Sequence, residues 1–194
     1  MNRRIDMEFN EILVNRRAIR EYEDRDVPFS IIEDILQDAC FAPTARNLQP
    51  CRFIIIRDRS FMKRISDECK KNLLADIIND PADPLREYES RFCDPQYNIF
   101  HNAPCVVYIV GSMGASLIDV DGALTAAYIM FSATARKLGT CWIGLGTHIR
   151  DQRIIDDMGI PKDCRIIAPI TIGYPLEIPL AAERHDPVIV KIIQ

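Results

Sequence analysis

The stretch APCVVYIVG, from Ala103 to Gly111, constrains the fold more directly than any other part of the sequence. Its residues 105–110 are apolar without interruption. A strand with one face in water alternates apolar and polar side chains, so an unbroken run indicates a strand that is buried on both faces. We therefore expect a central sheet with helices packed on both of its sides.

The segments on either side of this strand alternate between helical and extended patterns. Helical spacing of apolar residues predicts helices over 7–15, 28–41, 61–78, 119–138 and 151–158. Short apolar runs predict the other strands over 52–58, 140–146 and 165–175, and a last extended segment over 188–193. Gly139 is expected to cap the helix over 119–138. The segment 79–98, which contains several prolines, is expected to be an irregular surface excursion that could cover a site.

Bulk composition favours an ordinary globular protein with a single domain over residues 1–194. The net charge of −4 gives no support for a nucleic-acid partner. No apolar run approaches the ~18 residues needed to cross a membrane, and the N-terminal residues lack the apolar core of a secretion signal. The seven scattered cysteines form no CxxC pair and no zinc spacing, which predicts no metal site and favours a reducing cytoplasm.

The first of four segments that stand out is NRRAIREY, residues 15–22, which carries cations at three of five positions. A solvated basic turn explains this segment when it is taken alone. The alternative is a phosphate site, because arginine guanidinium groups match phosphate oxygens bidentately.

The second segment is the loop APTARNLQP, residues 42–50, which two prolines pin between a predicted helix and a predicted strand. Its simplest interpretation is a helix stop followed by a turn. The functional interpretation uses the amides of Asn47 and Gln49 as donor and acceptor pairs for the edge of a flat heterocycle.

The third segment is GTCWIGLG, residues 139–146, in which glycines at a strand end permit close approach of the backbone to a ligand. The run over 144–149 nearly matches the dinucleotide motif GxGxxG, but it lacks the third glycine. A Rossmann fold is therefore weakly supported. Trp142 taken alone is more typical of a core.

The fourth segment is IGYP, residues 172–175, with Arg184 beyond it. The four segments in this order resemble the FMN-dependent nitroreductases, from Arg16 to Arg184. The resemblance implies an α+β fold, a three-layer α/β/α sandwich around a mixed, mainly antiparallel central sheet. It also implies an interlocked homodimer with FMN at the interface.

The resemblance also implies which positions contact FMN. The cations that would hold the phosphate and flank the flavin are Arg16, Arg17, Arg20 and Arg184. The loop residues expected from the partner subunit are Pro43, Thr44, Ala45 and Asn47. The backbone expected to face the ring, with an N–H near N5, is that of Trp142, Ile143, Gly144, Leu145 and Gly146. Gln96 or Asn98 would supply an amide.

The sequence departs from the common pattern of this family at three places. Ala18, counted with the cofactor site, stands where a serine is frequent, so one hydroxyl contact to the phosphate is missing. Pro43-Thr44 replaces the usual Pro-Ser and keeps the hydroxyl. Cys51 and Arg52 follow Gln49-Pro50 where an aromatic residue is common, which alters the expected substrate pocket.

The implied function is transfer of reducing equivalents from NADH or NADPH to small organic acceptors, such as nitroaromatics, quinones or enones, by a ping-pong mechanism. The flavin carries the chemistry, so no protein side chain is expected to be catalytic, and no histidine receives such a role. An FMN-binding carrier or sensor without efficient turnover is the alternative. A specialised activity, such as reductive dehalogenation or flavin breakdown, remains open.

Overall fold

The computed structural model describes residues 7–80 and 82–194, and its centre is one sheet with the strand order β1-β2-β4-β3. The strands are β1 (Cys51–Ile56), β2 (Cys105–Ser112), β3 (Gly139–Trp142) and β4 (Cys164–Gly173). All three strand pairs are antiparallel. The only parallel pairing in the described residues is an isolated bridge between Ala18 and Thr140. The α+β sandwich is therefore confirmed.

The stretch quoted first forms β2, one of the two inner strands, and its residues 105–111 are buried. Successive side chains of a strand point to opposite faces, so β2 feeds two separate apolar clusters. Val107 and Ile109 belong to one cluster, whereas Val106 and Tyr108 belong to the other. Burial on both faces follows from helices on both sides of the sheet.

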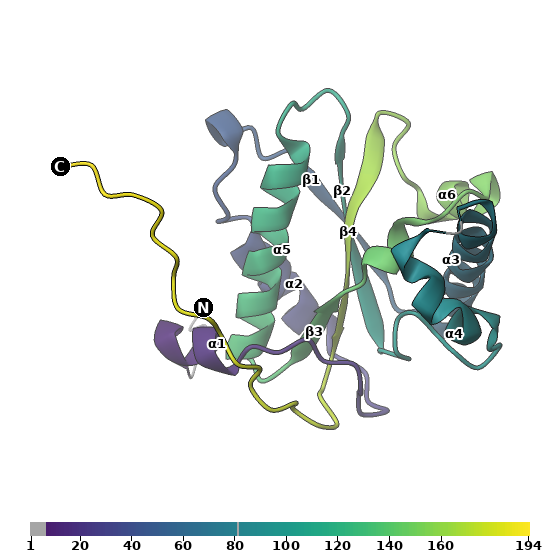
Figure 1. The fold of residues 1–194 in the computed structure, drawn as a ribbon, viewed down its shortest axis with the longest axis horizontal. Coiled ribbons are helices and arrows are strands. Elements are labelled where there is room, and N and C mark those ends of the chain that lie inside the picture. The colour runs from purple at the N-terminus through teal and green to yellow at the C-terminus, as the bar shows by residue number, and fades with distance from the viewer. Residues whose placement is uncertain (1–6, 81) are drawn as a thin grey trace.

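Helices cover the two faces of the sheet (Figure 1). One face carries α1 (Phe9–Asn15), α2 (Phe29–Ala39) and α5 (Ile118–Ala135). The other carries α3 (Arg59–Asn79), α4 (Glu89–Cys93) and α6 (Gln152–Met158). The short 3-10 helices are η1 (Ala45–Asn47), η2 (Pro84–Tyr88) and η3 (Gly144–Thr147). The expected irregular excursion over 79–98 thus contains η2 and α4.

The end of α5 differs from the sequence prediction. Lys137, and not Gly139, takes the left-handed conformation after the helix, with φ of 60°. Gly139 instead begins β3, where a Cβ would lie 2.5 Å from Cγ1 of Ile19. The glycine is thus explained by close packing of another segment rather than by a helix cap. A glycine does cap α6, because Gly159 follows that helix with φ of 68°.

Residues 174–176, which follow β4, still pair with residues 21–23, and the chain beyond them leaves the body of the molecule as an extended tail (Figure 1). Residues 188–193, expected to be extended, pair with no strand in the described chain, and their apolar side chains are exposed. Within residues 7–80 and 82–194, no helix is both long and apolar enough to span a membrane.

Candidate functional site

The arginine segment lies along the edge strand of the sheet. Ala18 bridges Thr140 of β3, and the N–H of Ile19 donates to the Thr140 carbonyl over 2.9 Å. Ile19 is buried against Gly139, where no side chain larger than hydrogen fits without displacement. Two segments more than 120 positions apart in sequence are therefore held side by side.

Tyr22 anchors the far end of the arginine segment. Its hydroxyl lies 2.8 Å from the Ile19 carbonyl, to which it donates, and 2.7 Å from the Thr171 hydroxyl. Burial raises the pKa of Tyr22 above its usual value, so the phenol stays protonated and able to donate. This contact fixes the backbone immediately before Arg20.

The three cations of this segment have different surroundings. Arg16 and Arg20 lie close enough to Cys141 for their charges to oppose the rise in pKa that burial imposes on its thiol. In the described part of the chain, neither guanidinium forms an ion pair with a carboxylate. Arg17 instead turns back, and its Nη1 donates to the carbonyls of Val14 and Arg16 over 2.6 and 2.9 Å. The guanidinium of Arg17 thus closes the C-terminal end of α1.

The glycine-containing turn follows β3 directly. Trp142 is 39% exposed, whereas Ile143 is buried and its N–H donates to the Pro169 carbonyl over 2.9 Å. A Cβ added to Gly144 would meet no atom within 4 Å. The first amides of a helix have no acceptor inside that helix, and Gly144 and Leu145 open η3. The turn therefore offers open space and backbone donors.

Gly146 has a different role from Gly144. A Cβ at this position would lie 3.0 Å from both Phe100 and Pro169, and the buried hydroxyl of Tyr108 donates to the Gly146 carbonyl over 3.2 Å. Internal packing therefore accounts for this glycine. Of the two glycines that the sequence singled out, Gly144 alone has the open space that an approaching ligand needs.

Two residues that the sequence analysis did not select lie near Arg20. Burial lowers the pKa of His101 to about 4, and the charges of Arg20 and Arg91 act in the same direction. Burial raises the pKa of Tyr97, whereas the charges of Arg91 and Arg20 oppose that rise. Nothing in the local pattern of the sequence distinguishes Tyr97 or His101, because only the fold brings them to the arginine segment.

The two amides proposed for the flavin are placed differently. Asn98 donates from Nδ2 to Oδ1 of Asn102 over 3.1 Å, and its own Oδ1 accepts from the Phe100 N–H over 2.9 Å. The Asn98 amide is thus engaged in its own turn. Gln96 is exposed, and its backbone N–H binds Oδ1 of Asp94 over 2.8 Å. The side chain of Gln96 remains the better placed of the two to meet a ligand.

The loop over 42–50 is held by contacts within itself and by one contact with α5. The Thr44 hydroxyl accepts from the Gln49 N–H over 3.0 Å, and Asn47 Oδ1 accepts from Gln49 Nε2 over 3.1 Å. The Ala45 N–H donates to Oδ1 of the buried Asp121 over 3.0 Å. Arg46, Asn47 and Gln49 have positive φ, so the loop has a defined and unusual backbone.

This loop and the arginine segment lie at opposite ends of α5 (Figure 1). The loop contacts Asp121 in the first turn of the helix. Near the other end, Thr134 and Arg17 line a cavity of about 500 Å³. Thirteen helical residues separate Asp121 from Thr134, a rise of about 20 Å. One chain therefore does not bring the two predicted halves of the site together.

Arg184 lies in the exposed tail after β4. Its side chain makes no hydrogen bond or ion pair with the residues described. Among the residues described, the structure thus shows no bond that fixes this arginine at Arg16 or Arg20. As for metals, no three histidine, cysteine or acidic side chains within residues 7–80 and 82–194 are grouped so as to bind an ion.

Comparison with known proteins shows the family of this chain. The sequence model described as "Nitroreductase family" matches residues 13–174. A protein of Archaeoglobus fulgidus with the provisional name NADH dehydrogenase/NAD(P)H nitroreductase is 27% identical over 173 residues. That alignment covers 85% of this chain and 84% of the relative.

Solved structures show the same fold. A nitroreductase with bound FMN from Bacteroides fragilis superposes with a TM-score of 0.80 at 19% identity, over 96% of this chain and 98% of that one. An iodotyrosine deiodinase bound to FMN and 3-iodo-L-tyrosine superposes with a TM-score of 0.76 at 17% identity, over 94% and 97% of the two chains. From the family match over most of its length, we conclude that this chain belongs to the nitroreductase family.

Proposed function

We propose that this chain is an FMN-dependent oxidoreductase that transfers reducing equivalents from NADH or NADPH to small organic acceptors, such as nitroaromatics, quinones and enones. The observation that carries the proposal is the placement of Arg16 and Arg20 near Cys141 on β3, the strand that leads into the open turn at Gly144. Guanidinium groups suit a phosphate, and a backbone turn without a side chain suits a flat ring. Bound FMN would supply the redox chemistry.

The chain's own residues would bind and orient this cofactor. Arg16, with Arg184 of the tail, is proposed to hold the phosphate. Arg20 is proposed to lie at the pyrimidine edge, where a cation stabilises the negative charge that accompanies reduction. The backbone of residues 142–146 would face the ring.

Two positions of the arginine segment receive narrower roles in this proposal. Because the Arg17 guanidinium binds the end of α1, we propose that Arg17 contributes through its main chain. Ala18 has no hydroxyl to offer, so it would supply backbone contact alone. The phosphate would therefore depend on fewer side chains than the sequence suggests.

We further propose that the site is completed by a second copy of the chain. The residues for the partner's side of the ring are Pro43, Thr44, Ala45 and Asn47, which lie at the far end of α5 from Arg16. Two α5 helices packed antiparallel about a twofold axis would bring the loop of each chain to the arginine segment of the other. The exposed apolar side chains of this face support that arrangement, since they include Val14, Phe41, Val120 and Leu124.

The visible spectrum of the purified protein is the first test. We expect flavin absorption, and FMN as the flavin released on denaturation. Steady-state oxidation of NADH and of NADPH with a nitroaromatic or a quinone then tests turnover. Parallel double-reciprocal plots are expected, because donor and acceptor would share one flavin face. Tight FMN binding without turnover would instead support a carrier or a sensor.

The compartment is part of the proposal as well. All seven cysteines are free in the structure, and three of them, at positions 40, 51 and 93, are at least partly exposed. Exposed thiols persist in a reducing compartment, so we place the protein in the cytoplasm.

A further inference from the structure

Helix α3 buries four polar side chains beside its apolar stripe, in two pairs that are each four residues apart. Ser66 and Lys70 lie on one flank of the stripe, and Glu68 and Asn72 lie on the other. Buried polar groups are stable only when they have hydrogen-bond partners. The partners of the two pairs belong to two different loops, the turn before β2 and the segment after η3.

One group of contacts holds the segment after η3. Glu68 Oε1 accepts from Asn72 Nδ2 over 2.7 Å and from the Asp151 N–H over 3.1 Å. Asn72 Nδ2 also donates to the His148 carbonyl over 2.8 Å. The chain that leaves the Gly144 turn is thus fixed to α3.

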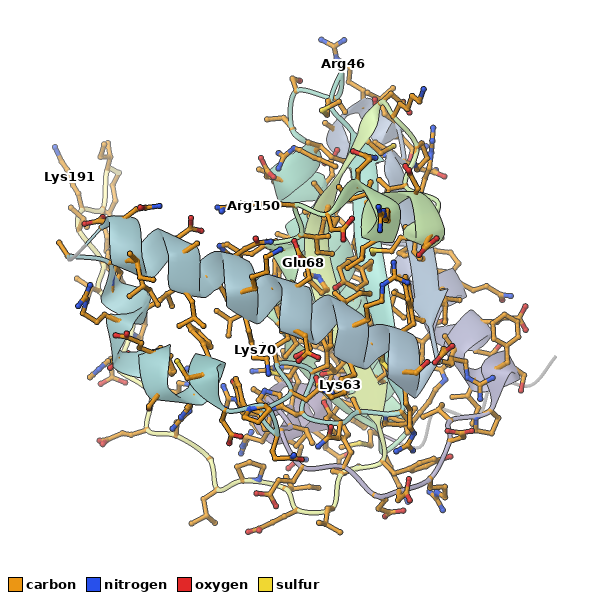
Figure 2. The ribbon with its side chains drawn as sticks, turned by 90° about the vertical axis from the view of Figure 1, so that its right-hand side faces the viewer. Arg46, Lys63, Glu68, Lys70, Arg150 and Lys191 are labelled. Carbon is orange, nitrogen blue, oxygen red and sulfur yellow. The ribbon has the colours of Figure 1, made fainter. Side chains whose placement is uncertain are left out.

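Lys70 holds the loop on the other side. Its Nζ donates to the carbonyls of Asp94 and Tyr97 over 3.0 and 2.8 Å, and it lies 3.1 Å from Oδ1 of Asp67. The side chain is only 6% exposed. Three acceptors match the three protons of an ammonium group, so this cation is fully bonded. Figure 2 shows Lys70 near the middle of α3 and Lys63 nearer to its start.

The turn from Asp94 to Tyr97 has internal bonds that do not depend on Lys70. The Tyr97 N–H donates to the Asp94 carbonyl over 3.2 Å, and the Gln96 N–H donates to Asp94 Oδ1 over 2.8 Å. Without Lys70 the turn can therefore still form, but it loses two attachments to α3. We expect it to shift away from the helix and to open its own bonds more often.

Such a shift would reach the candidate site through Tyr97. This side chain packs against the same two apolar clusters as Leu145 of the Gly144 turn. The charge of Arg20 also acts on both Tyr97 and His101. Tyr97 therefore links the loop that Lys70 holds to the residues proposed to surround the flavin.

We propose that Lys70 is a positioning residue that sets the wall of the acceptor pocket by fixing the turn over 94–97. The role of this lysine rests on the proposed function, because the acceptor pocket would be the space beside the bound flavin. Lys70 touches neither substrate nor cofactor in this proposal. It acts through the placement of Tyr97 and His101.

The test compares Lys70→Met with Lys63→Met. Lys63 binds the same carboxylate, with Nζ 2.6 Å from Asp67 Oδ2, but its side chain is 57% exposed. Hydrogen exchange in a peptide covering residues 94–101 is expected to quicken in Lys70→Met and to stay unchanged in Lys63→Met. The KM for a nitroaromatic acceptor is expected to rise about 10-fold in Lys70→Met alone, with kcat within about twofold.

Lys70→Arg, which retains several donors, is expected to restore most of the acceptor KM, and Lys70→Gln replaces Lys70→Met if the latter does not fold. Unchanged exchange over 94–101, or faster exchange with an unchanged KM, would overturn the role of Lys70. A wild-type protein that binds no FMN or reduces no acceptor would instead contradict the proposed function. The two failures are therefore distinguishable.

Discussion

The two helical layers of the molecule present very different surfaces. The outer side of α3 carries ion pairs with neighbouring elements, including Arg64 with Asp157 and Arg150 with Asp76. The outer side of α5 exposes apolar side chains, including Val120 at 54% and Leu124 at 37%. Contiguous exposed apolar surface marks an interaction site in a soluble protein. The contrast indicates that the α3 layer has a charged surface suited to solvent, whereas the α5 layer has an apolar surface suited to burial.

The same contrast separates the two halves of the candidate site. The arginine segment and the Gly144 turn are held together within one chain, by β3 and by Tyr22. The loop over 42–50 and the tail with Arg184 lie on the side of α5. Among the described residues, neither is bonded to the arginine segment or to the Gly144 turn. A second copy that covers the α5 layer would complete both the surface and the site.

The largest effect is expected from charges on the exposed side of α5. Val120→Asp combined with Leu124→Asp should abolish dimerisation and FMN binding together, because carboxylates would be buried without partners. Light scattering measures the first effect and flavin absorbance the second. Ile78→Asp is the matched control, since Ile78 is 71% exposed on α3. A dimer with full flavin in the double variant would show that α5 is not the interface.

Two glycines of one strand and its following turn should respond in opposite ways. Gly144→Val is expected to weaken FMN by about 100-fold without loss of apoprotein stability, because a side chain there meets open space. Gly139→Ala is expected to lower the free energy of unfolding by about 1–3 kcal/mol, because its Cβ would collide with Ile19. Flavin titration and thermal melts of the apoproteins separate the two effects. Full FMN binding by Gly144→Val would mean that the ring lies elsewhere.

A substitution of Arg184 tests whether the C-terminal tail contributes to FMN binding. A charge-assisted hydrogen bond contributes about 1.5–3 kcal/mol, so Arg184→Ala should weaken FMN by about 10- to 100-fold. Riboflavin has no phosphate, and its affinity should therefore be unchanged in the variant. Titration of both flavins into both apoproteins gives the comparison. Equal affinity of the wild type for FMN and riboflavin would remove the phosphate site.

The smallest effect concerns the pH dependence of apoprotein stability. The pKa of His101 is about 4 in the folded chain and 6.5 ordinarily. Between pH 6.5 and 4 the imidazole is therefore protonated in the unfolded chain but neutral in the folded chain. The free energy of unfolding should therefore fall as pH drops from 6.5 to 4. His101→Asn, which tolerates the positive φ of this position, should show a shallower decline in denaturant titrations. Equal slopes would place His101 in a more solvated setting.

Much of the fold follows from local patterns in the sequence. The apolar run of β2 predicted burial on both faces, and the helices expected over 28–41 and 151–158 correspond to α2 and α6. These signals depend only on neighbouring residues. The prediction that Gly139 caps α5 was wrong, because a helix cap and a close packing contact both select glycine. Only the position of Ile19 decides between the two.

The site was harder to predict wherever its contacts are distant in sequence. Lys70 stands next to Lys71, and such a pair on a helix is typical of a solvated face. Its burial depends on the carbonyls of Asp94 and Tyr97, which no local pattern reveals. The direction of Arg17 likewise depends on where α1 ends. Spacing identified the arginines, but only the fold distinguishes their roles.

The most direct test of a site shared by two chains is a mixed dimer. One chain carries Gly144→Val, which blocks its own side of the ring, and the other carries Pro43→Trp, which blocks the loop that it lends to its partner. Each variant dimer alone should bind almost no FMN. In the mixed dimer, isolated with two different tags, one site has both lesions and the other has none. We predict about half of the wild-type flavin and activity per chain; a mixed dimer as empty as its parents would show that each site lies within a single chain.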